Sequence, residues 1–369
     1  LVSEVVSRFD DEHPRVRWAA INAMGQMETD LGPQLQENFH GIVVPGLIQV
    51  MNDSQNPRVQ AHAAAAVVNF TECCEVEKMR GHLDKLVGKL VQLLVSSQLM
   101  VQEQAVTAIA SVAHCVSGLF IRHYPRIVPT LKQMLLTCRL KEQRLLRGKV
   151  MECLSIVALA VGRETFQPDS REVLDQFLDT QTTSDDNDPQ TSYLLQAWGR
   201  VARALKHDFT PYVNVVMPSV IKATEVKVEL QSVEMTKEEE EKEQDEEEQP
   251  GTWVVMVEGD DGRSRRVTLD TYALEQKMTG CGLLATYFKE LPDALGGWID
   301  PAAKAMVPLL SFIFHEHMRA VAAGMVPQLV GCAVQASKQG RVEATYVKEL
   351  STLIFDRLIS ALDTEPDAA

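Results

Sequence analysis

The chain contains 369 residues, of which 45% are hydrophobic, and its formal net charge at pH 7 is −15. This negative charge disfavours nonspecific binding to nucleic acid or to an anionic membrane, and it favours basic partners. The seven cysteines form no CxxC pair and mostly fall on predicted buried helix faces, as reduced thiols of a cytosolic or nuclear protein do. We expect no signal peptide and no apolar run long enough to span a bilayer.

A pattern of small apolar residues behind a Pro-Arg-Val step recurs along the chain. It appears first as DDEHPRVRWAAINAMGQM, and it returns as NPRVQAHAAAAVVNF, MVQEQAVTAIASV and LLRGKVMECLSIV. Looser copies follow Asp188 and His317. The anchors of the first four copies, Val16, Val59, Val101 and Leu146, are 43, 42 and 45 residues apart. The chain is therefore predicted to be a repeat protein.

Each copy is preceded by another amphipathic stretch with a helical period, for example 39–51, 82–95 and 124–138. The repeat unit is thus two helices in about 43 residues, which fits HEAT or armadillo repeats and favours HEAT. We predict an all-α fold, a right-handed HEAT-repeat α-solenoid whose second helices line the concave face. Because the chain begins inside a helix, we expect it to be a piece of a longer array.

The predicted helices follow one another in pairs. The first helices are expected at 1–9, 35–51, 79–95, 120–138, 170–180, 211–224 and 294–314. Their partners are expected at 13–30, 57–73, 99–116, 142–161, 189–206, around Leu274 to Ala285, and at 317–335, with 342–362 beginning an eighth pair. Pro at the first helical position suits Pro14, Pro57 and Pro189, because that N–H would lack a partner anyway.

The sixth pair is interrupted, so the predicted organisation is repeats over 1–225, an insertion over 226–267 and repeats over 268–369. Lys237–Gln249 holds nine acids and two lysines, which predicts a self-repelling, disordered run. Alternating residues around an Asp-Gly turn then predict a β-hairpin that Trp253 pins to the array. A contact for a basic partner is one interpretation of this loop, and a solubilising role is the other. Its candidate residues are Glu238, Glu241, Asp245, Glu248 and Trp253.

No catalytic constellation stands out in the sequence. It lacks a P-loop, a GxSxG elbow and an HExxH motif. The His315-Glu316-His317 triplet falls at a predicted inter-helix turn, where solvated side chains are favoured over a metal site. Gly280 and Gly282 are better explained by close helix packing than by phosphate binding. We therefore predict no enzyme activity, no cofactor and no metal.

The exposed side of the second helices carries the candidate binding residues. With Val16 taken as the buried anchor, polar side chains at four-residue steps align across the repeats into columns. Amides can bond a peptide backbone, carboxylates can pair with lysine or arginine, and tryptophan can pack on a cation. The alternative is that these are ordinary solvent-facing residues, with Trp18 packed on the next repeat. The candidates are Trp18, Asn22, Gln26, Asn69, Glu72, Glu103 and Glu152.

These stretches together resemble the importin-beta (karyopherin-beta) family of nuclear transport receptors. The resemblance is carried by HPRVRWAAINAMGQMETD, RVQAHAAAAVVNFTE, MVQEQAVTAIASVA, LLRGKVMECLSIVALAVG and DDNDPQTSYLLQAWGRVARAL. It implies a shuttling carrier of cytoplasm and nucleus that binds lysine-rich localisation signals of cargo proteins on its inner face. It also implies release by Ran-GTP and contact with phenylalanine-glycine repeats of nucleoporins, without direct binding to nucleic acid or membrane.

By position, the resemblance supports Asn22, Asn69, Glu72 and Glu103 as signal-binding residues, with Trp18 and Glu152 as weaker candidates. The family's main Ran-contacting units are expected outside this chain, so Ran would be bound by the full-length receptor. The alternative from another functional class is a HEAT scaffold subunit of a multiprotein complex. A scaffold should present larger apolar contact patches than the columns described above.

Overall fold

The computed structural model describes residues 1–184, 188–227, 230–234, 252–258, 264–312 and 315–363. Contacts divide the chain into two compact units, Leu1–Leu205 (unit 1) and Lys206–Ala369 (unit 2). This division lies within the first predicted segment, 1–225, and each unit contains its own helix pairs. The predicted helical repeat array is confirmed in both units.

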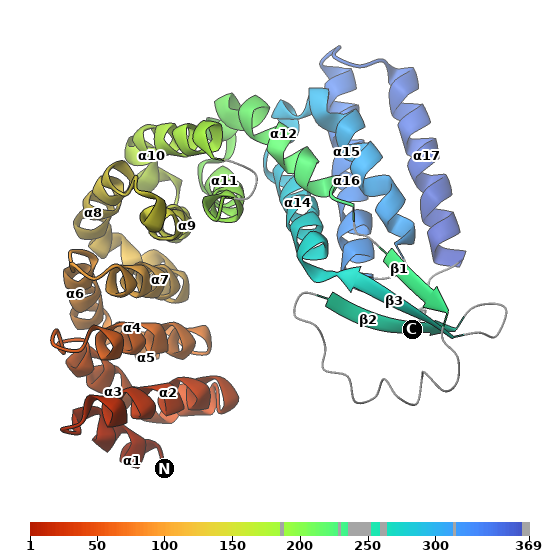
Figure 1. The fold of residues 1–369 in the computed structure, drawn as a ribbon. Coiled ribbons are helices and arrows are strands. Elements are labelled where there is room, and N and C mark those ends of the chain that lie inside the picture. The colour runs from red at the N-terminus through yellow and green to blue at the C-terminus, as the bar shows by residue number, and fades with distance from the viewer. Residues whose placement is uncertain (185–187, 228–229, 235–251, 259–263, 313–314, 364–369) are drawn as a thin grey trace. The chain divides into compact units, whose positions relative to one another are not determined.

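Unit 1 consists of two layers of helices, with the second-helix layer on the inside of its curve (Figure 1). The first-helix layer contains α1 (Val2–Ser7), α3 (Gln34–Val50), α6 (Leu83–Leu94), α8 (Tyr124–Thr137) and α10 (Arg163–Thr183). The second-helix layer contains α2 (Pro14–Asp30), α4 (Pro57–Glu72), α7 (Leu99–Val116), α9 (Arg144–Val161) and α11 (Gln190–Leu205), each packed on the next. Shorter connecting elements are η1 (Arg8–Asp10), α5 (Val76–Arg80), η2 (Ser117–His123) and η3 (Lys141–Gln143).

Small side chains let the second helices approach one another closely. Ala63, Ala64 and Ala66 are buried on α4, and α7 buries a similar set around Ala105 and Ala108. Larger groups fill the junctions between the layers. Trp198, for example, packs edge-on against Phe177 with ring centroids 5.4 Å apart, and its Nε1–H donates to Gln181 Oε1 at 2.9 Å.

One detail of the sequence-based register was wrong. Val16, taken as the buried anchor, is 39% exposed, and α2 buries Ala20, Ile21 and Met24 instead. The reason is that α2 has a neighbouring second helix on one side, α4, whereas Val59 lies on a helix flanked by α2 and α7. The prediction that most cysteines are buried is confirmed, because four of the seven are buried, while Cys73 is exposed and Cys74 and Cys115 are half-buried.

The expectation that no apolar run could span a membrane also needs correction. By length and composition alone, the helical stretches 99–137 and Glu316–Lys338 are apolar enough to do so. In the structure, many of these apolar side chains are buried inside the protein. Val101, Ile109 and Val112 are completely buried between neighbouring helices, as core helices of repeat arrays are.

Unit 2 continues the alternation of first and second helices. Its helical elements are η4 (Lys206–Tyr212), α12 (Val213–Thr224), α14 (Thr271–Glu290), η6 (Pro292–Ala294), η7 (Gly296–Trp298), α15 (Ile299–Met306), η8 (Val307–Ser311), α16 (Glu316–Lys338) and α17 (Ala344–Asp363). The second helices α14 and α16 pack on each other, while α12 packs on α14 and both α15 and α17 pack on α16. The predicted first helix at 294–314 is broken into the short helix α15 and 3-10 turns.

A three-stranded antiparallel sheet lies between α12 and α14 in the sequence (Figure 1). Its order is β1 (Leu230–Glu234), β3 (Ser264–Asp270), β2 (Thr252–Glu258), with β2 and β3 paired as neighbours. The sequence analysis expected two strands and missed β1. The Asp-Gly turn and the acidic run Lys237–Gln249 lie outside the described residues. β3 leads directly into α14, where Asp270 Oδ1 accepts hydrogen bonds from the Tyr272 and Ala273 amides.

Gly280 and Gly282 give opposite expectations on substitution. A Cβ at Gly280 would lie 2.8 Å from Thr224 N and 2.9 Å from Ala223 C, so the close packing predicted for this glycine is confirmed. The same prediction is wrong for Gly282, because a Cβ there would have no neighbour within 4 Å among the described residues. We expect Gly280→Ala to lower the free energy of unfolding of unit 2 by about 1–3 kcal/mol, because α12 backbone must move. Gly282→Ala should leave it unchanged or raise it by up to ~1 kcal/mol. Chemical denaturation compares the two variants, and equal effects would contradict the packing argument.

Candidate functional site

The exposed surface of α2, α4 and α7 brings most of the predicted site residues onto one layer of unit 1. Asn22, Gln26 and Glu72 are exposed, while Asn69 and Glu103 are half-buried. Their helices are consecutive members of the layer, and α2 and α7 both pack on α4. These five residues therefore lie on adjacent helices of one layer.

Several polar residues of these columns also bond one repeat to the next. Asn69 Nδ2 donates to the Gly25 carbonyl at 3.1 Å, and the hydroxyls of Thr71 and Ser111 lie 2.6 Å apart. His62 Nε2 lies 3.2 Å from Asn22 Oδ1. These hydrogen bonds fix the direction of the side chains. Each amide has several donor and acceptor sites and uses one of them here.

Three carboxylates on this layer differ in their availability. Glu72 is exposed, and it has no ion-pair partner among the residues that the structure describes. Glu103 is half-buried, and it contributes with Glu152 to the raised pKa of Tyr193, which is caused first by burial of that side chain. Glu152 forms an ion pair with Arg200, with Oε1 and Nη2 3.3 Å apart. Sequence reasoning had no signal for this pairing, because the two residues are on different repeats.

The carboxyl ends of α2 and α4 add to the negative charge near Glu72. Asp30 and Glu72 are the last residues of these helices, and Glu75 and Glu77 follow in exposed positions. The partial negative charge of a helix carboxyl end has the same sign as these side chains. This edge of the layer is consequently suited to cations.

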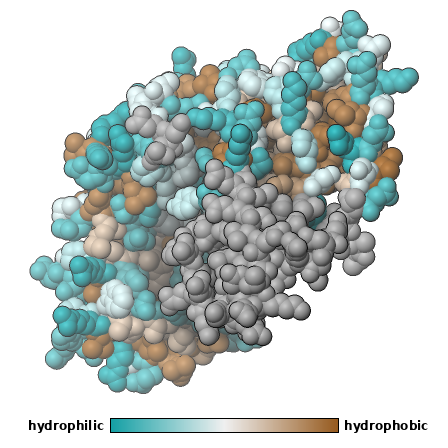
Figure 2. Space-filling view, turned by 45° about the vertical axis from the view of Figure 1, so that its right-hand side comes forward, coloured by the Kyte–Doolittle hydropathy of each residue, from teal (hydrophilic) through white to brown (hydrophobic). Residues whose placement is uncertain are grey.

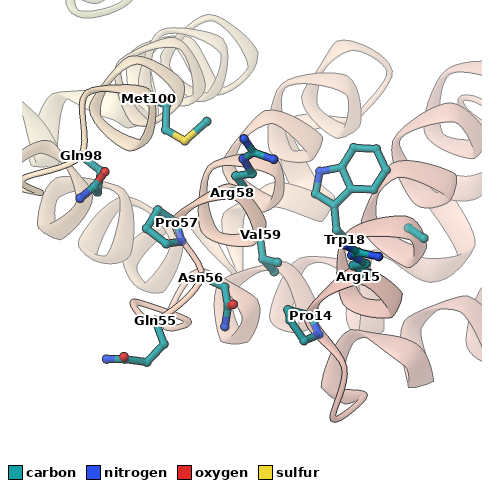
Figure 3. Close-up of a pocket in the computed structure, with 11 residues that line it drawn as sticks. Pro14, Arg15, Trp18, Gln55, Asn56, Pro57, Arg58, Val59, Gln98 and Met100 are labelled. Atoms are coloured by element: carbon teal, nitrogen blue, oxygen red, sulfur yellow. The ribbon is translucent and has the colours of Figure 1, made fainter.

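Trp18 lies in different surroundings from the acidic residues. Its indole stacks on the His62 ring with centroids 4.9 Å apart, and it lines an open cavity of about 920 Å³ with Arg15, Arg58 and Met100 (Figure 3). The sequence analysis did not select either arginine. The recurring Pro-Arg-Val step could have revealed them, because it places one arginine at the same point of two consecutive repeats.

The candidates in the insertion have little structural description. Glu238, Glu241, Asp245 and Glu248 lie outside the described residues. Trp253 is in β2, where it pairs with Leu269 of β3. Within the described part of the chain, no group of three or more His, Cys, Asp or Glu side chains could hold a metal ion.

Comparisons with known proteins agree with the repeat architecture. Residues 47–238 match the family model described as importin subunit beta-1-like, TPR repeats. Importin subunit beta-3 of Saccharomyces cerevisiae is 31% identical over 99% of this chain and 32% of its own length. The probable importin-5 homolog of Dictyostelium discoideum is 25% identical over 81% of this chain and 26% of its own length.

Solved structures show the same relationship. The crystal structure of Kap121p bound to Pho4p has a TM-score of 0.81 and 30% identity, covering 99% of this chain and 33% of that chain. The crystal structure of Kap121p bound to Nup53p has a TM-score of 0.80 at the same identity, with the same coverage of both chains. The chain therefore spans about a third of the length of these relatives. With a family model matching more than half of its residues, the chain belongs to the importin-beta family.

Proposed function

We propose that the chain is part of a nuclear transport receptor, and that the second-helix layer of unit 1 binds a lysine-rich localisation signal of protein cargo. Support comes from the relatives, since structures of Kap121p are described as bound to Pho4p, Ste12p and Nup53p. The observation that carries the proposal is the exposed carboxylate of Glu72 on α4, the helix whose Asn69 bonds the Gly25 carbonyl of α2. Residues of three consecutive repeats can then contact one extended segment.

The proposed recognition uses two kinds of contact. Glu72 and Glu103 would pair with lysine ammonium groups, and Asn22, Gln26 and the Oδ1 of Asn69 would bond the backbone of the bound segment. Because Glu72 is exposed, its contribution should be screened by salt and should act strongly on the association rate. Glu152 is a weaker contact in this scheme, since Arg200 already neutralises part of its charge.

The remaining proposed activities are assigned to the full-length receptor. Release of cargo by Ran-GTP, contact with phenylalanine-glycine nucleoporin repeats and shuttling between cytoplasm and nucleus are proposed for the full-length protein. A scaffold role receives less support from the surface. On the face shown in Figure 2, hydrophobic and hydrophilic residues are interspersed over the described part of the chain.

Charge reversal at Glu72 tests the proposal. We expect Glu72→Lys to weaken binding of a labelled lysine-rich peptide by about tenfold or more, because an attractive pair becomes repulsive. The matched control is Glu37→Lys, an exposed acid on α3 in the other layer that should change binding less than twofold. Fluorescence anisotropy measures both. Equal losses in the two variants would show that only net charge matters, and would refute a site on α4.

A further inference from the structure

A cavity at the amino ends of α2, α4 and α7 has chemistry opposite to that of the acidic edge. Its walls come from three consecutive repeats, and its volume is about 920 Å³. Trp18 and Arg58 project on the same side of α2 and α4, and Met100 and Gln98 come from the start of α7 (Figure 3). The first helical prolines, Pro14 and Pro57, form part of the lining.

The apolar part of the cavity combines exposed and buried side chains. Trp18 and Met100 are each 42% exposed, whereas Val59 at the base is 3% exposed. One face of the Trp18 indole is covered by His62, whose Nε2 lies 3.2 Å from Asn22 Oδ1. An indole fixed in this way can receive an apolar side chain on its other face at a low cost in side-chain entropy.

Two guanidinium groups, those of Arg15 and Arg58, lie beside this apolar surface. Arg15 and Arg58 are exposed, and neither has an ion-pair partner among the residues that the structure describes. No acidic residue lines the cavity, and two acids near the arginines in the sequence are engaged elsewhere. Asp53 pairs with Arg17 at 2.7 Å and accepts from Asn56 Nδ2 at 2.9 Å, while Asp11 accepts from the His13 amide. The cavity is therefore a locally positive site on a chain whose net charge is −15.

We propose that this cavity binds a short acidic segment of a partner protein, with one bulky apolar side chain against Trp18 and Met100 and flanking carboxylates on Arg15 and Arg58. The arginine fork matches a carboxylate through two parallel hydrogen bonds, and an adjacent lysine would be repelled. The groove crosses three repeats, which suits an extended peptide. Trp18 then serves this site and not the lysine-rich segment.

Peptide binding to the full 369-residue chain tests the inference. The probe is a labelled 12-residue peptide with a central Leu flanked by two Glu on each side, and anisotropy should give a dissociation constant on the order of 10 μM. Exchanging Leu for Ser, or the four Glu for Lys, should weaken binding by about tenfold or more. If the Ser peptide binds as well as the Leu peptide, the apolar cavity takes no part and the inference is wrong.

Variants of the chain separate this site from the proposed cargo surface. Arg15→Glu with Arg58→Glu, and Trp18→Ala alone, should each weaken the acidic peptide by about tenfold or more. Arg15→Gln with Arg58→Gln serves as a second charge variant with minimal change of shape, and thermal unfolding confirms folding. Glu72→Lys, which tests the cargo surface, should not weaken the acidic peptide. Binding that survives both arginine variants, or that is lost in Glu72→Lys, would overturn the proposal without bearing on the lysine-rich peptide.

Discussion

Replacing Arg147 by alanine is expected to lower the free energy of unfolding of unit 1 by about 3–5 kcal/mol, the range for removing one partner of a buried charged network. The Arg147 side chain is 4% exposed and contacts three other helices. Its Nε donates to the Leu135 carbonyl of α8 at 3.1 Å, and its Nη1 donates to Thr180 of α10 and to Gln190 of α11. Burial lowers the pKa of this guanidinium, with the charge of Arg139 as the next cause.

The size of the effect follows from the groups that would remain. Without the guanidinium, the Thr180 hydroxyl and the Gln190 carboxamide oxygen stay buried and lose a charged donor. Arg139→Ala is the matched control, because Arg139 and its partner Asp179 are 44% and 42% exposed, and it should cost no more than about 1 kcal/mol. Hydrogen exchange of α8 to α11 measures local stability in both variants. Equal protection in the two would contradict the network.

Replacing Glu28 by glutamine is expected to stabilise unit 1, and to do so more strongly as the pH rises. The Glu28 side chain is completely buried, and neither carboxylate oxygen has a hydrogen-bond partner in the described part of the chain. Burial raises its pKa from 4.5 to about 9. The folded state therefore holds a proton on Glu28 at neutral pH, while the unfolded chain releases it.

The sign of the pH dependence follows from this difference. The pKa of Glu28 is higher in the folded state than in the unfolded chain. Its contribution to the free energy of unfolding is therefore fully present below pH 4.5 and is lost as the pH rises toward 9. Between pH 5 and pH 8 the loss amounts to about 4 kcal/mol, at about 1.4 kcal/mol per pH unit. Glutamine does not titrate, but its amide must also be buried. We therefore expect Glu28→Gln to raise the free energy of unfolding at pH 8 by about 2–4 kcal/mol.

Urea unfolding of wild type and Glu28→Gln at pH 5, 6.5 and 8 checks this expectation. The difference in unfolding free energy between the two proteins should grow with pH. Taking this difference cancels the contributions of the other titrating groups, which both proteins share. Glu72→Gln, at an exposed position of unit 1, is the matched control for the loss of one carboxyl group. A parallel profile for Glu28→Gln would mean that the carboxyl is not held protonated in the folded state.

The sequence predicted the helix pairs of unit 1 well because the repeat supplies the same information several times. The second helices at 57–73 and 99–116 agree with α4 and α7 within one residue. Val16 was misplaced because burial at one end of the layer depends on which neighbours exist, and periodicity does not contain that information. Strand β1 was missed because its partner β3 lies more than 30 residues away in the chain.

The candidate site was less predictable, since pairing between repeats decides which charges are free. Nothing in the local sequence distinguishes Glu72, which is exposed, from Glu152, which faces Arg200 at 3.3 Å. Trp18 likewise was grouped with the acidic residues by its place in a column. Its contact with His62 and its position beside Arg15 and Arg58 come from side-chain directions on two helices.

The most direct test of the proposed cargo surface is to map where a lysine-rich peptide contacts the chain. A peptide carrying a photoreactive group next to its central lysine is cross-linked to the full 369-residue chain, and mass spectrometry identifies the labelled residues. The proposal predicts cross-links on the exposed faces of α2, α4 and α7, around Gln26 and Glu72, that disappear in Glu72→Lys. Cross-links concentrated on α3 and α6, or on unit 2, would contradict it.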